Sequence, residues 1–163
     1  MTHHPDYSFS TFERFVDSII GRTEWFAIEQ ARIAAFADCT EDRQWIHLDA
    51  ERAARETAQR STIAHGLLTL SLLPRFSYEV GLLPTDASRA LNYGFDKVRF
   101  IAPVPTGSRV RDVLRLQSVV RKAPGQALIE VVHTVEIEGS DKPALVASAV
   151  SLVFAAAGSG AAA

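Results

Sequence analysis

The chain has 163 residues, enough for one domain with a buried core, and its net charge of −2, from 17 basic and 19 acidic residues, gives no indication of nucleic-acid binding. Its single cysteine, Cys39, excludes an intramolecular disulfide, has no companion for a cysteine metal site and fits a reducing compartment. Residues 1–10 lack the features of a secretory signal, and no apolar run approaches the roughly 20 residues of a membrane span, so we expect a cytoplasmic protein that does not enter a membrane.

Two helical patterns are expected in the first third of the chain, after a flexible N-terminus of residues 1–10. Apolar residues recur at three- and four-residue intervals from Phe12 to Ile19, and Gly21 is suited to end that helix. A second pattern runs from Ile28 to about Asp38, with Glu29 in its first turn. We expect this second helix to lead into a polar turn.

The middle of the chain predicts the helix around which the fold is built. Residues 48–60 are rich in helix formers, and Asp49 is placed to cap them, so we expect a short helix with a solvated charged face. From Leu67 to Val80 apolar residues lie nearly all round the helix, which is typical of a buried helix. Pro74 removes one backbone donor and predicts a kink near Leu70.

The last part of the chain alternates apolar and polar residues, which predicts three or four long antiparallel strands. The first runs from residue 109 to residue 121, a turn at residues 123–126 follows, and a last apolar strand at residues 144–154 is expected at the centre of the sheet. The expected buried faces carry Val110, Leu114, Leu116 and Val120, and then Ile129, Val131, His133, Val135 and Ile137. We predict an α+β fold with the buried helix across a curved sheet, and we expect His133 to be a core or interface residue.

The strongest chemical signal is the pair Asp42 and His47, five residues apart in the polar turn and followed by Gly66 at the start of the buried helix. A carboxylate and an imidazole that converge on one water can act as general acid and base. The backbone N–H of Gly66 can hold a developing oxyanion. From spacing alone, the alternative is that Asp42 caps a turn and His47 is a surface residue.

Two segments carry a resemblance to a known family: residues 42–47, DRQWIH, and residues 61–68, STIAHGLL. Together they resemble the signature of the MaoC-like hydratases, the (R)-specific enoyl-CoA hydratase family, and in particular its branch similar to the nodulation protein N. The family pattern is Asp, any residue, Asn or Gln, Pro, an aliphatic residue and His. The positions that fit are Asp42, Gln44, Ile46 and His47.

One position departs from that pattern. Trp45 stands where Pro is usual, a departure that occurs in the nodulation-protein-like branch. Residues 92–111 also resemble the family, so the match runs from about residue 26 to residue 154. The resemblance implies a hot-dog fold, in which a curved antiparallel sheet wraps a long central helix, as a single domain of residues 11–154 before a flexible Ala/Gly/Ser tail of residues 155–163. Because hot-dog proteins commonly dimerise, with active sites near the interface, a homodimer or higher homo-oligomer is expected.

The resemblance also implies an enzyme, a hydro-lyase of EC class 4.2.1, that adds water reversibly to a trans-2-enoyl-CoA and gives a (3R)-hydroxyacyl-CoA. Asp42 and His47 would activate the water, one protonating C2 while the other takes the proton from oxygen. The N–H of Gly66 would hold the thioester oxygen. Coenzyme A is then part of the acyl-CoA substrate, and neither a cofactor nor a metal is expected.

Further candidates for substrate binding are Gln44, Ser61, Thr62, His65 and Arg99. For His65 we favour a structural role at the loop-to-helix junction, and the two hydroxyl residues alternatively cap the buried helix. Arg99 alternatively keeps a strand soluble rather than meeting a coenzyme A phosphate. Two other functions stay open: a hot-dog acyl-CoA thioesterase that uses the same glycine N–H, and a non-catalytic acyl-CoA-binding or partner subunit.

Overall fold

The computed structural model describes residues 6–157. Its helical elements are η1 (Phe12–Phe15), α1 (Gln30–Thr40), α2 (Trp45–Leu48), α3 (Ala50–Glu56), α4 (Gly66–Ser71) and α5 (Leu73–Glu79). Its strands are β1 (Ile19–Arg22), β2 (Phe26–Ala27), β3 (Ala87–Phe100), β4 (Arg109–Ala123), β5 (Gln126–Ile137) and β6 (Leu145–Ala155). No helix of this part of the chain has the length and apolar character needed to cross a membrane.

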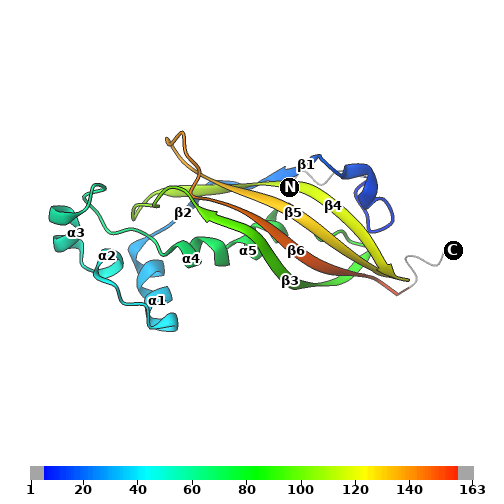
Figure 1. Ribbon diagram of the computed structural model, residues 1–163, viewed down its shortest axis with the longest axis horizontal. Helices are drawn as coiled ribbons and strands as arrows, with labels where there is room; N and C mark the ends of the chain where they lie inside the picture. Colours follow the sequence, from blue (N-terminus) through cyan, green and yellow to red (C-terminus); the bar gives the residue numbers. More distant parts are fainter. Residues whose placement is uncertain (1–5, 158–163) are drawn as a thin grey trace.

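The strands form one antiparallel sheet in the order β1-β4-β5-β6-β3, with β2 paired to β4. The predicted hairpin is confirmed, because β4 and β5 pair along their length and Gly125 in the turn has a φ of 71°, which glycine adopts without strain. The last strand, β6, lies between β5 and β3, as its unbroken apolar sequence predicted. The sheet curves over α4 and α5, while α1 to α3 lie together at one end of the molecule (Figure 1). This is the hot-dog arrangement that the resemblance implied.

The central helix differs from the prediction of one kinked helix, because it is divided into α4 and α5 at Leu72. Pro74 lies in the first turn of α5, where its missing N–H and fixed φ cost nothing. The break is therefore two residues beyond the predicted kink at Leu70. The sheet-facing side chains remain buried on both sides of it, with Leu68 4% and Leu73 1% exposed.

The predicted helix from Phe12 to Ile19 is wrong. Its first residues form a single 3-10 turn, and Asp17, with a φ of 65°, turns the chain so that Ile19 begins β1. Gly21 belongs to this strand and does not end a helix. The apolar spacing was set by tertiary packing, since Phe12 is buried in a cluster beneath β4 and β5.

Parts of the two predicted flexible ends are packed or paired in the structure. Tyr7 and Phe9 are each 5% exposed and pack in the cluster that contains Phe12. At the other end Ala155 still pairs in β6. The rest of the two predicted segments, residues 1–5 and 158–163, lies outside the described residues.

The remaining helices agree with the sequence in place and are shorter or shifted by a few residues. Glu29 precedes the first residue of α1, and α3 begins after Asp49, whose carboxylate accepts the backbone N–H of Arg52 at 2.9 Å. On β4, Val120 is 45% exposed and does not share the buried face as predicted. The cause is a register shift between Leu116 and Ser118, which turns the following side chains over.

Candidate active site

The polar turn after α1 holds the first predicted site residue. Glu41 ends α1 with a φ of 62°, and Asp42 follows it with a side chain that is 53% exposed. Three residues further on begins the single turn α2, which carries His47, 6% exposed. The carbonyl of Ile46 accepts the N–H of Ile63 at 3.0 Å, so α2 is joined to the segment that leads into α4.

One nitrogen of the His47 imidazole is held by a backbone carbonyl, and among residues 6–157 the other has no hydrogen-bond partner. Its Nδ1 lies 2.7 Å from the carbonyl oxygen of Ile63. A carbonyl only accepts, so Nδ1 carries the hydrogen and Nε2 presents a lone pair. Burial lowers the pKa of His47, and His65 acts in the same direction, although the bond to Ile63 and the charge of Asp42 oppose this. His47 is thus suited to accept a proton.

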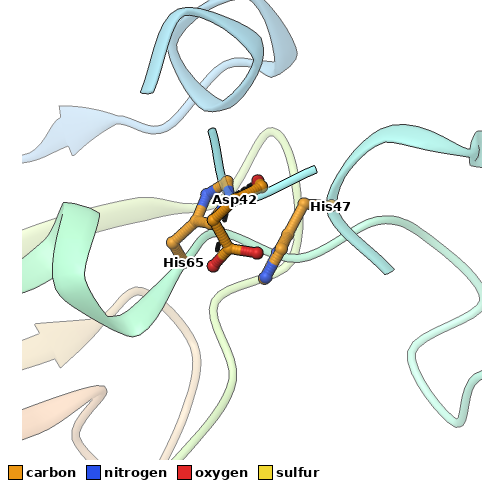
Figure 2. A group of neighbouring side chains, drawn as sticks. All are labelled: Asp42, His47 and His65. Carbon is orange, nitrogen blue, oxygen red and sulfur yellow. Dashed lines mark hydrogen bonds and ion pairs between the residues drawn. The ribbon is translucent and has the colours of Figure 1, made fainter. Parts of the chain in front are cut away.

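His65 lies at the junction between the loop and α4, and it touches both predicted catalytic residues. Its ring stacks on that of His47 with centroids 3.7 Å apart and planes 24° apart. Its Nε2 is 3.0 Å from the backbone carbonyl of Asp42 and 4.0 Å from the carboxylate Oδ2. Figure 2 shows the three side chains gathered in one place, although they come from separate segments. His65 therefore fixes the position of the turn as well as the face of the His47 ring.

These three side chains have the composition of a metal site, since their ligand atoms lie within 4.8 Å of one another. Their orientation does not suit one. A metal ion lies near the plane of each imidazole that binds it, and two rings stacked at 24° do not converge on a common point. The arrangement is better suited to holding a water against Asp42 and the free nitrogen of His47.

A cavity of about 390 Å³ opens beside His47. Its lining is mostly apolar and includes Ile46, Ile63, Leu67, Phe100, Ile101 and Val104. Gly66 lines the same cavity at the first position of α4, and among residues 6–157 its N–H has no hydrogen-bond partner. A Cβ at this position would lie 2.9 Å from the Phe100 ring, so the close approach of that ring requires glycine.

Gln30 on α1 supports this site and was not predicted from the sequence. Its amide nitrogen donates to the backbone carbonyl of His47 at 2.9 Å. Its amide oxygen accepts the hydroxyls of Thr62 at 2.5 Å and Thr106 at 3.0 Å. The hydroxyl of Thr62 is thus committed to this network. The only signal in the sequence is a polar residue on an amphipathic helix, which does not reveal a partner 17 residues away.

The other predicted substrate residues lie elsewhere. Gln44 is exposed at the start of α2, and the hydroxyl of Ser61 donates to the carbonyl of Thr62. Arg99 is exposed on β3, and its guanidinium donates to the carbonyl of Val98. In the described part of the chain, none of Gln44, Ser61 and Arg99 lines the cavity that His47 and Gly66 share.

Comparison with known proteins gives a consistent result. The family model described as MaoC like domain matches residues 12–140. The 3-hydroxyacyl-thioester dehydratase Z of Mycobacterium tuberculosis is 47% identical over 131 residues, which cover 80% of this chain and 85% of that protein. Nodulation protein N of Rhizobium leguminosarum is 41% identical over 134 residues, which cover 82% of this chain and 83% of that protein.

Solved structures with the same fold include a MaoC-like dehydratase from Rhodospirillum rubrum, with a TM-score of 0.69 and 21% identity over 83% of this chain and 90% of that one. The (R)-hydratase from A. caviae has a TM-score of 0.65 and 24% identity over 82% of this chain and 95% of that one. A third, the HadBC complex from Mycobacterium tuberculosis, a 3R-hydroxyacyl-ACP dehydratase, has a TM-score of 0.66 and 12% identity over 84% of this chain and 99% of that one. These structures share the hot-dog fold with the chain.

Proposed function

Because the chain belongs to the MaoC-like family, we propose that it is an (R)-specific hydratase, which adds water reversibly to a trans-2-enoyl-CoA and gives a (3R)-hydroxyacyl-CoA. The predicted family and the predicted hydro-lyase class, EC 4.2.1, are confirmed, since its relatives and neighbours include proteins named dehydratase or hydratase. The observation that carries the finer proposal is the meeting of a carboxylate and a buried neutral imidazole beside an apolar cavity that Gly66 also lines.

The water is bound between Asp42 and His47. The carboxylate of Asp42 accepts one hydrogen of the water, and Nε2 of His47 accepts the other. As the oxygen attacks C3, His47 takes its proton, and the electrons of the double bond move toward the thioester oxygen. The enolate then collapses and C2 takes the proton from the imidazolium, so His47 ends the cycle neutral. Asp42 lowers the cost of the transient positive charge on the ring.

The N–H of Gly66 is the donor for the thioester oxygen as it gains enolate character. A single donor of this kind contributes roughly 3 kcal/mol to the transition state in other enzymes. The apolar lining strengthens that interaction, because few competing dipoles surround it. Position 66 requires glycine because the Phe100 ring packs directly against it, where a Cβ would lie 2.9 Å from the ring.

The acyl chain extends along the sheet-facing side of α4 and α5, where buried Leu and Phe side chains limit its length. Coenzyme A remains outside, with its phosphates near exposed Arg99.

The edge strand β3 exposes Leu91 and Tyr93, at 51% and 70%, and we propose that a second copy covers this edge in a homodimer. Size-exclusion chromatography with light scattering tests this: a monomer at micromolar concentration contradicts it.

The decisive experiment follows the loss of enoyl-thioester absorbance with crotonyl-CoA for the wild type, Asp42→Asn and His47→Gln. Each variant is expected to lose about 10²-fold or more in kcat, because it removes one partner of the water. Asp38→Asn is the matched control, since Asp38 is an exposed carboxylate of the same helix end, paired with Arg43. Wild-type turnover by both site variants would falsify the assignment.

The same samples separate the two other functions. A thioesterase releases free thiol from acyl-CoA, whereas a hydratase removes the double bond and leaves the thioester intact. A soluble homodimer that is inert on both substrates indicates a non-catalytic acyl-CoA-binding subunit. The pair Asp42 and His47 argues against a non-catalytic subunit, and its spacing in residues 42–47 favours the hydratase over the thioesterase because it matches the hydratase signature.

A further inference from the structure

A second carboxylate and imidazole pair is buried within the sheet, away from the turn that holds Asp42. Asp112 on β4 and His133 on β5 are 0% and 1% exposed, and His133 Nδ1 lies 2.5 Å from Asp112 Oδ2. They are diagonal neighbours on the helix-facing side, since His133 is opposite Leu114 in the strand pairing. The second oxygen, Oδ1 of Asp112, has no hydrogen-bond partner in the described part of the chain. A buried polar pair in an apolar core is costly, which calls for a reason beyond packing.

His133 forms part of the wall of a second cavity, of about 120 Å³, between α5 and the sheet. Most of the inner wall is apolar, with Leu73, Leu82, Ile129, Val131 and Val153. For comparison, an engineered apolar cavity of about 150 Å³ binds benzene, so this one has room for a short segment of a chain. Because Asp112 occupies Nδ1, the ring nitrogen of His133 that is left for a ligand is Nε2.

The second cavity is lined by the same helical region and the same strand region, β6, as the cavity beside His47. Thr69 lines the first and Leu73 the second, and four helical residues span about 6 Å. On β6, likewise, Ala149 lines the second cavity, and Ala144, just before that strand, lines the first. An acyl chain that starts at Gly66 and follows the helices toward α5 would run in the direction of His133.

We propose that this cavity receives the far part of the acyl chain and that His133 binds an oxygen there, so that the preferred substrates are thioesters whose acyl chain carries a hydroxyl group. This rests on the proposed hydratase function. A hydroxyl both donates and accepts, so it pairs with Nε2 in either protonation state of the ring. A plain alkyl chain in the same place leaves that nitrogen without a partner in an apolar site.

The experiment compares kcat/KM for pairs of trans-2-enoyl-CoA substrates that differ only in a hydroxyl on the terminal carbon, in the octenoyl, decenoyl and dodecenoyl series. In the wild type, the hydroxylated substrate is expected to be favoured about tenfold at the length that brings its oxygen to His133, the value of one well-placed hydrogen bond. The double variant Asp112→Val with His133→Leu replaces the pair by apolar groups and is expected to favour the plain chain. Thr134→Val is the matched control, because Thr134 is next to His133 on the opposite face of β5 and should leave the ratio unchanged.

Each outcome decides the matter. Equal rates on both members of every pair by a wild type that hydrates the plain substrates overturn the inference and leave the hydratase in place. A preference that persists in the double variant also overturns it, since the oxygen is then bound elsewhere. If no enoyl-CoA is hydrated, the proposed function fails, and calorimetric binding of decanoyl-CoA and ω-hydroxydecanoyl-CoA decides instead: tighter binding of the hydroxylated thioester supports the site, and equal binding rejects it.

Discussion

Gln30 offers a sharp test of how the site is held, because its two amide atoms serve different partners. The substitution Gln30→Glu keeps the size of the side chain and its acceptor for Thr62 and Thr106, and replaces the donor to the His47 carbonyl by an oxygen. Loss of that bond leaves a carbonyl unpaired in a part-buried place, at a cost of about 1–3 kcal/mol. For a chain of this size the melting temperature falls by about 2–4 °C per kcal/mol, so a fall of about 2–12 °C is expected.

The substitution Gln30→Glu should lower kcat by more than its loss of stability explains. A displacement of His47 by about 1 Å costs on the order of 10²-fold in rate, so kcat with crotonyl-CoA is expected to fall strongly while KM changes little. Thr106→Val is the control, because it breaks the network at the amide oxygen and leaves the bond to His47. It should lower the melting temperature and keep kcat. If Gln30→Glu keeps wild-type kcat, the claim that the amide nitrogen of Gln30 positions His47 is refuted.

Three further predictions concern the same region. Gly66→Ala places a Cβ 2.9 Å from the Phe100 ring, so kcat should fall about tenfold or more and recover in part when Phe100→Ala is added; no recovery contradicts a steric cause. Burial lowers the pKa of His47 below 6.5, and the reaction needs the neutral ring. The value of kcat/KM should therefore fall with decreasing pH only below pH 6.5; a fall that already begins above pH 6.5 contradicts His47 as the base. Asp49→Ala removes the cap on Arg52 N–H, so urea unfolding should show a loss of about 1 kcal/mol with kcat unchanged.

The elements that the sequence predicted well are those specified by residues close in the chain. The turn at residues 123–126 carries its own proline and glycine, and the flanking alternation defines the hairpin. The candidate site was predicted in the same way, since Asp42 and His47 lie within six residues and Gly66 opens the buried helix. What brought these segments together, the stacking of His65 on His47, depends on the fold and left no local pattern.

Two of the misses involve contacts across long sequence separations. Residues 12–19 have a helical spacing that a turn followed by an edge strand also satisfies, and pairing of Ile19 with Arg115 decided between them. Asp112 falls between Val110 and Leu114 on a buried face, which alternation alone would predict. A carboxylate is rarely placed in a core without a partner, and its partner is His133, 21 residues away on the next strand. A charge at a buried strand position and a histidine at a buried position of the neighbouring strand are the signal that finds such a pair.

Unfolding measurements can show whether the fold requires the pair Asp112 and His133 or only tolerates it. His133→Leu alone leaves the carboxylate buried without its partner, and the free energy of unfolding should fall by about 3–5 kcal/mol, or about 6–20 °C in melting temperature. The double variant with Asp112→Val should be much less destabilised, since replacing both members of a buried pair by apolar groups is often neutral or stabilising. Urea unfolding of the two variants checks this, and equal losses in both would show that the pair stabilises the fold in its own right. If the double variant is as stable as the wild type, folding does not require the pair, which is the result expected if His133 serves the ligand proposed for the second cavity.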